Sequence, residues 1–214
     1  LVASHVREFA DETDNLLGGV LIARGARLYV DFFSSHMPFA YYLAALPAYF
    51  GMASLEQFRV FTNALTIVAT LGVVWGFGRS LPVLVIGVWA VLAVYGHTLQ
   101  FGEMLTAGTS AGYGILVAGL LFYTTPGLHF SSRQAFVISA AIFVAVQSEL
   151  VAVFPVALLG VCYLATRLQH ASRTSLATQA REAAVLLLAV VAPHLLLLIA
   201  YWASGTLGDF VYDA

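Results

Sequence analysis

Long apolar runs constrain this chain more than any other feature of its sequence. Crossing a bilayer as a helix takes about 20 apolar residues, and backbone polar groups in lipid must be satisfied within the segment itself. The 214 residues are 61% hydrophobic and only 9% charged, whereas soluble domains carry about 25% charged residues. We therefore expect an integral membrane protein built from α-helices.

Six apolar segments are candidate spans. They cover residues 59–78, 81–100, 104–124, 134–146, 150–166 and 183–203. The fourth and fifth are short, and joined across the polar residues 147–149 they would form a helix on the order of 50 Å long, too long for one crossing. The expected fold is an all-α, polytopic membrane helical bundle of about six spans over 59–203. An external segment with juxtamembrane helices, 1–58, precedes it, and 204–214 begin the next external loop.

Charge placement predicts the orientation of the bundle. Residues 38–52 are apolar but too few for a comfortable span, and Pro47 interrupts them, so we expect them to lie flat on the membrane. The loops on one side then contain Arg79, Arg133, Arg167, Arg173 and Arg181, with Glu182. The loops on the other side contain Asp11, Glu12, Asp14, Asp31, Glu56, Glu103, Glu149, Asp209 and Asp213. Because cytoplasmic loops carry an excess of basic residues, the acidic side is predicted to be external.

Other features exclude several classes of protein. The net charge of −2 gives no reason to expect a nucleic-acid partner. A single cysteine, Cys162, precludes a disulfide within the chain and is expected to be a small buried hydrophobe. His97 and His194 are expected to be packed, hydrogen-bonded histidines. No signal peptide opens the sequence, and because no methionine starts it, we expect that residues precede Leu1 in the natural protein.

Acidic residues gather at three separate points on the predicted external side. They are the cluster of Asp11, Glu12 and Asp14, then Glu103, then Glu149. Acids at membrane depth are costly and usually face a cavity, although each could instead be solvated in a loop. In a helix, Asp11 and Asp14 would share one face while Glu12 points elsewhere. The opening cluster could therefore serve two tasks.

A series of short motifs follows the same order as in a known family. The motifs are Asp11-Glu12, "GARLYVD" (25–31), "HMPFAYYLAAL" (36–46), Phe50-Gly51, Arg59, "QFGEM" around Glu103 and "QSELVAVFP" (147–155). This order resembles the N-terminal module of the GT-C superfamily of polyprenyl-phosphate-dependent glycosyltransferases, especially the protein O-mannosyltransferase and aminoarabinose-transferase branch. Two departures stand out. One proline, Pro38, replaces a proline pair, and the sequence has no lysine.

The resemblance implies an inverting glycosyltransferase in a bacterial or archaeal plasma membrane, with its acidic site on the outer face. It would move a hexosyl or pentosyl group from a polyprenyl-phosphate donor to an acceptor. Asp11 would be the catalytic base, and Glu12 would position the acceptor or an arginine. The resemblance assigns donor or acceptor binding to Asp14, His36, Tyr41, Tyr42, Arg59, Glu103, Gln147 and Glu149.

Several alternatives stay open. Arg59 could be an interfacial anchor that snorkels, and His36 a helix-start residue facing solvent. No residue set has metal-ligand spacing, so no cofactor is expected; by resemblance, a divalent metal would use Asp11 and Glu103. Expected partners are the lipid-linked donor, membrane lipids and other membrane subunits. Anionic lipids could also contact the polar loop 167–181. The rival functions are a non-catalytic GT-C-like subunit of a larger complex and, least favoured because no internal repeat is seen, a transporter.

Overall fold

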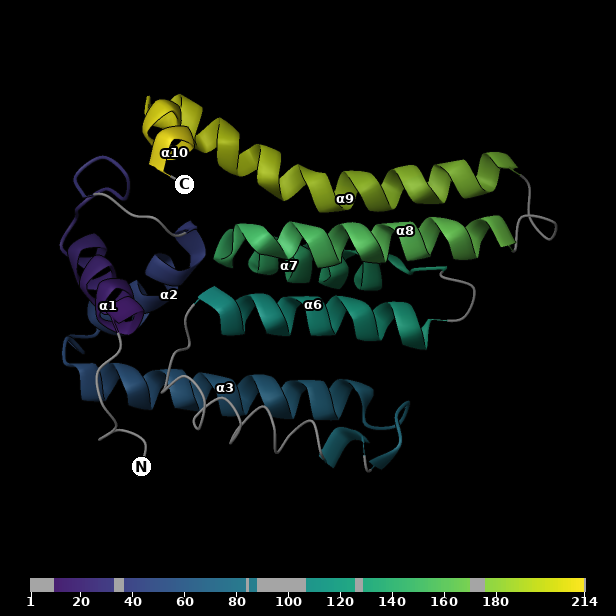
Figure 1. Cartoon of the computed structure of the whole chain (residues 1–214), viewed down its shortest axis with the longest axis horizontal. Coiled ribbons are helices and arrows are strands. Elements are labelled where there is room, and N and C mark those ends of the chain that lie inside the picture. The colour runs from purple at the N-terminus through teal and green to yellow at the C-terminus, as the bar shows by residue number, and fades with distance from the viewer. Residues whose placement is uncertain are drawn as a thin grey trace. The chain divides into compact units, whose positions relative to one another are not determined.

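A computed structural model describes residues 10–32, 37–83, 85–87, 107–125, 129–169 and 176–213. This described part is helical and contains no strand, only an isolated bridge between Leu28 and Phe32. The all-α prediction is therefore confirmed for these residues (Figure 1). Two compact units divide the chain: Leu1–Ser110 with Asp213–Ala214, called here the first unit, and Ala111–Tyr212, the second unit. His36, Glu103 and most of the expected span 81–100 lie outside the described residues.

The first unit contains α1 (Ala10–Ala23), α2 (Pro38–Tyr49) and α3 (Leu55–Phe77). Helices α1 and α2 pack unusually closely because α1 has glycines at the contact. A Cβ atom built on Gly19 would lie 2.6 Å from the backbone carbonyl carbon of Ala44, closer than real Cβ atoms approach. The pair therefore forms one tightly packed layer.

Helix α3 begins at a capping box. The Ser54 side chain accepts from the backbone N–H of Gln57, and the Gln57 side chain accepts from the backbone N–H of Ser54. Leu16 of α1, Ala44 of α2 and Phe58 of α3 form a buried cluster, which packs both shorter helices against the first turns of α3 (Figure 1).

The second unit is a bundle of antiparallel helices. Its described elements are most of α6 (Ala107–Thr124), then α7 (Ser132–Ser148), the short 3₁₀ helix η4 (Leu150–Ala152), α8 (Val153–Gln169), α9 (Leu176–Ala203) and α10 (Leu207–Asp213). Successive helices from α6 to α9 run in opposite directions (Figure 1). Ala118, Ile138, Tyr163 and Leu186 bring one residue from each of these four helices into a common core.

Three stretches of the described chain are long and apolar enough to cross a membrane: Leu55–Phe77, Leu150–Arg167 and Ala177–Ala203. By length and composition this is a helical membrane protein. Three is fewer than the six spans expected. Helix α7, for example, has 17 residues, about 26 Å of helix against a hydrocarbon core about 30 Å thick. Cys162, expected to be buried, is exposed on α8 within an apolar stretch, so it faces the surroundings of the bundle.

Candidate functional site

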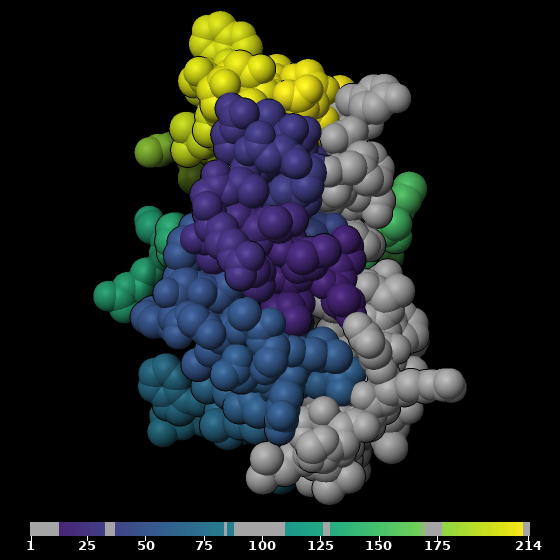
Figure 2. All heavy atoms as spheres, turned by 90° about the vertical axis from the view of Figure 1, so that its left-hand side faces the viewer, coloured from purple at the N-terminus to yellow at the C-terminus, as the bar shows by residue number. Residues whose placement is uncertain are grey.

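The acidic helix α1 is held to α2 by a short hydrogen bond. The hydroxyl of Tyr41 donates to a carboxylate oxygen of Asp14 over 2.5 Å. Tyr41 is only 1% exposed, and the edge of its ring packs against Phe32, with the ring centroids 6.1 Å apart. Tyr41 thus fixes the position of α1, while Tyr42, the next residue, is exposed. Figure 2 shows α1 at the surface of the first unit.

The Asp11-Glu12 pair lies in the first turn of this same helix. Asp11 precedes Asp14 by three residues, which places both positions on one face of α1, whereas Glu12 belongs to another face. The structure describes the backbone of the pair and not its side chains. Its expected partners His36 and Glu103 are outside the described residues, so their roles stay predictions.

Arg59 lies near the start of α3, next to Phe58, in the turn that α1 and α2 contact. Its side chain is 2% exposed, unlike a solvent-facing anchor. Buried charges are found only where they are paired or hydrogen-bonded. Three buried threonines continue a polar stripe along the same helix: Thr62, Thr66 and Thr70.

The turn after α1 is organised by Arg27 and Asp31. The Asp31 carboxylate accepts from the Arg27 backbone N–H at 2.8 Å and from Arg27 Nε at 3.2 Å. These bonds hold the pKa of Asp31 below its usual value, and the bond from the Arg27 side chain has the larger effect. Gly25 has a φ of 95°, a left-handed conformation that glycine adopts without strain, and it reverses the chain here. Asp31 therefore shapes this turn as an ionised acid.

In the second unit, Gln147 of α7 bonds to His194 of α9. The side-chain amide nitrogen of Gln147 lies 3.0 Å from His194 Nδ1. The bond joins α7 to α9 through two polar side chains that both lie within the helical bundle. Buried beside this bond, Gln147 Oε1 and Ser148 Oγ have no hydrogen-bond partner in the described part of the chain. Glu149, half-buried, follows directly at the end of α7, where its extended backbone breaks the helix.

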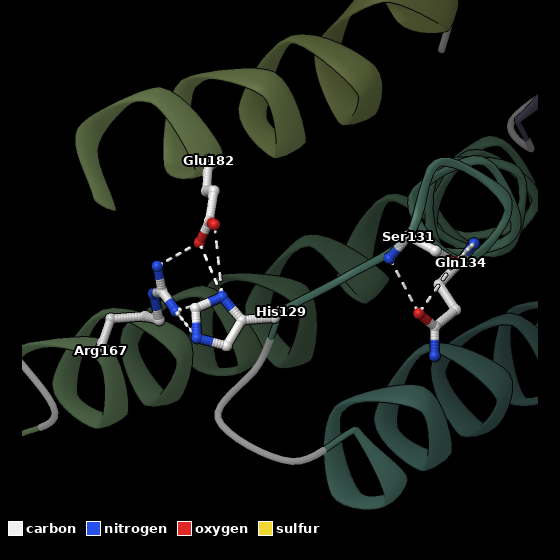
Figure 3. Close-up of polar contacts among 5 residues, drawn as sticks. All are labelled: His129, Ser131, Gln134, Arg167 and Glu182. Carbon is white, nitrogen blue, oxygen red and sulfur yellow. Dashed lines mark hydrogen bonds and ion pairs between the residues drawn. The ribbon is translucent and has the colours of Figure 1, made fainter. Parts of the chain in front are cut away.

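A second polar cluster lies at the opposite end of the helices of this unit. Arg167 of α8 donates to Glu182 of α9, and its other terminal nitrogen is 3.2 Å from both ring nitrogens of His129 (Figure 3). His129 Nδ1 is also 3.1 Å from Glu182. Next to it, Ser131 and Gln134 form the capping box that starts α7 (Figure 3). Sequence reasoning did not predict this cluster, although Glu182 is the one acid among the arginines on that side.

Among the described residues, no three His, Cys, Asp or Glu side chains are grouped to hold a metal. No family model, curated protein or solved structure matches this chain. The candidate site is therefore defined by residues of the first unit: Asp11 and Glu12 in α1, with Asp14 bonded to Tyr41 beneath them and Arg59 in the neighbouring turn of α3. Gln147 and Glu149 belong to the second unit.

Proposed function

We propose that this chain is the N-terminal part of an inverting glycosyltransferase that uses a polyprenyl-phosphate sugar donor. The observation that carries the proposal is the fixed position of the acidic helix. The Asp14–Tyr41 bond and the close contact of Gly19 with Ala44 hold α1 on α2, and both helices pack on the first turns of α3. The helix whose first turn contains Asp11 and Glu12 is thereby packed against the start of an apolar helix of span length.

That location suits a transfer between a lipid-anchored donor and a water-borne acceptor. In the proposed reaction an acceptor hydroxyl attacks the anomeric carbon, the bond from that carbon to the phosphate oxygen breaks, and Asp11 takes the hydroxyl proton. Polyprenyl phosphate leaves with the bonding electron pair. Proton transfer to a placed carboxylate and positive charge near the leaving phosphate both lower the barrier. We assign the first role to Asp11 and the second to Arg59.

The proposed orientation puts the acidic site outside a multi-pass protein in a bacterial or archaeal plasma membrane. It is supported by charge placement along the antiparallel helices of the second unit. Arg133 and Arg181 begin α7 and α9, whereas Glu149 ends α7 and Asp209 lies beyond the end of α9. Basic ends of spans are usually cytoplasmic, which favours an external position for the acidic ends.

The experiment is sugar transfer by the full-length natural protein in proteoliposomes that contain a radiolabelled polyprenyl-phosphate sugar. We expect release of polyprenyl phosphate and transfer of label to a hydroxyl acceptor. Absence of turnover with polyprenyl-phosphate hexose and pentose donors alike would overturn the proposal. It would leave the non-catalytic membrane subunit as the better interpretation.

A further inference from the structure

Two hollows in the second unit share part of their lining. The smaller, of about 250 Å³, is lined by Phe130, Thr178, Arg181 and Glu182 among others. The larger, of about 480 Å³, lies among α6, α7, α8 and α9 and is lined almost entirely by apolar side chains. Tyr163 and Leu186 line both hollows, so the two adjoin. We call the two together the α8–α9 slot; the smaller hollow is its polar end and the larger its apolar body.

The polar end of the slot carries one uncompensated positive charge. Glu182 is bonded to Arg167 and faces His129, so its negative charge is balanced there. Arg181 forms no ion pair with any residue that the structure describes, and its side chain is exposed. An anion entering this end would therefore meet an available guanidinium, which binds phosphate oxygens through two parallel hydrogen bonds.

The apolar body runs along two helices of span length. Its lining includes Gly160 of α8 and Leu187 and Val190 of α9, within Leu150–Arg167 and Ala177–Ala203. Gly160 is exposed, and a Cβ atom there would meet nothing within 4 Å. The volume falls within the roughly 300–1,000 Å³ of small-molecule sites. The body is thus a partly open apolar hollow beside two helices of span length.

We propose that the α8–α9 slot binds an anionic glycerophospholipid from the leaflet at the arginine-rich end of the bundle. The lipid phosphate would bond to Arg181, and one acyl chain would lie in the apolar body beside Gly160. A lipid fits better than a soluble anion because the charged end adjoins an apolar hollow of acyl-chain character. The site is separate from the first unit and does not depend on the proposed glycosyl transfer.

The test uses the full-length protein in phosphatidylcholine nanodiscs doped with a trace lipid whose acyl chain is photoreactive. Phosphatidylglycerol and phosphatidylcholine probes are compared, and cross-linked peptides are mapped by mass spectrometry. We expect the anionic probe to label α8 and α9 in preference to the zwitterionic one. Arg181→Gln should lower this preference about fivefold. Arg133→Gln is the matched control, because Arg133 is exposed but does not line the slot.

The acyl chain is tested separately by filling the apolar body. Gly160→Leu should reduce cross-linking of α8 and α9 several-fold without lowering the melting temperature, because a side chain there meets open space. Gly119→Leu is the control, since Gly119 of α6 is equally open but lines neither hollow. Equal labelling by both probes, or equal effects of Arg133→Gln and Arg181→Gln, would overturn the proposal. So would unchanged labelling in Gly160→Leu, or loss of labelling when inorganic phosphate is added.

Discussion

The hydroxyl of Ser139 in α7 donates a 2.5 Å hydrogen bond to the backbone carbonyl oxygen of Ala189 in α9. This carbonyl lacks its usual donor within its own helix, because the residue four positions later is Pro193, which has no N–H. Ser139 therefore supplies a donor for the carbonyl that the proline leaves without its usual partner, and the bond joins α7 to α9.

Removing this hydroxyl should destabilise the second unit. Ser139→Ala leaves the Ala189 carbonyl without a donor and should lower the unfolding free energy by about 0.6–1.7 kcal/mol, the usual range for such bonds in membranes. In a Pro193→Ala background, residue 193 regains its N–H and can donate to Ala189, so the same substitution should cost less. Denaturant titration in mixed micelles measures both differences. An equal cost of Ser139→Ala in the two backgrounds would contradict this account.

The close contact of α1 with α2 should be sensitive to a single methyl group. Gly19→Ala would place its Cβ 2.6–2.8 Å from backbone and side-chain atoms of Ala44, and such overpacking typically costs about 1–3 kcal/mol. Gly76→Ala in α3 is the matched control, since a Cβ there meets nothing within 4 Å, and alanine favours a helix by roughly 0.5–1 kcal/mol. Thermal unfolding should show a lower midpoint for the first variant only. A midpoint that is unchanged in Gly19→Ala would show that the two helices can separate freely.

Asp31 should titrate as a carboxyl stabilised in its ionised form. Arg27 lowers its pKa in the folded state, so its contribution to stability is complete above the unfolded-state pKa and is lost as pH falls through the folded-state pKa. In Arg27→Gln the pKa of Asp31 should rise toward its ordinary value, about 3.9. Arg24→Gln, an exposed arginine nearby, is the control. Carbon-13 NMR of the Asp31 carboxyl reads the pKa directly, and equal values in wild type and Arg27→Gln would refute the assignment.

The proposed orientation predicts which ends of the second unit face outward. Cys162 is first replaced by alanine, because it is exposed and would react. A cysteine at position 149 should then be labelled from outside intact cells by a membrane-impermeant maleimide, whereas a cysteine at 133 should react only after the cells are opened. Both positions lie at ends of α7, so they differ mainly in side. If intact cells were labelled at position 133 but not at position 149, the orientation would be the opposite of the proposed one.

The all-α class could be predicted from the sequence because long apolar runs are typical of membrane-spanning helices. The number of spans could not, since three stretches of the described chain, and not six, are long and apolar enough to cross a membrane. Some boundaries could not. Helix α3 starts at Leu55, before the predicted 59, because the Ser54–Gln57 capping box determines its first turn. Helix α9 starts at Leu176 instead of 183, because Glu182 in its early turns bonds to Arg167. Polar residues that looked like a loop therefore form a helix through contacts distant in sequence.

The site was predictable only in part. Helical spacing was enough to place Asp11 and Asp14 on one face of α1. The partner of Asp14, Tyr41, is 27 residues away, and the sequence suggested a binding role for that tyrosine without indicating the bond. Likewise, only the packing of α7 against α9 identifies Ser139 as the donor to the Ala189 carbonyl. Pairs of this kind depend on which helices pack against each other. The hydrophobic periodicity of a single helix does not contain that information.

The central claim is that Asp11 is the base of a glycosyl transfer, and Asp11→Asn tests it most directly. The asparagine keeps the size of the side chain but cannot accept the proton as a carboxylate does. Asp14→Asn is the matched control, one turn away on the same face of α1, because the asparagine oxygen can still accept the hydrogen bond from Tyr41 that holds the helix in place. The measurement is the single-turnover rate of sugar transfer from a bound polyprenyl-phosphate donor by the full-length protein in proteoliposomes. The account predicts a loss of about 10²–10⁴-fold for Asp11→Asn, with donor binding retained, and a far smaller loss for Asp14→Asn. A near-normal rate for Asp11→Asn, or an equal loss in both variants, would contradict it.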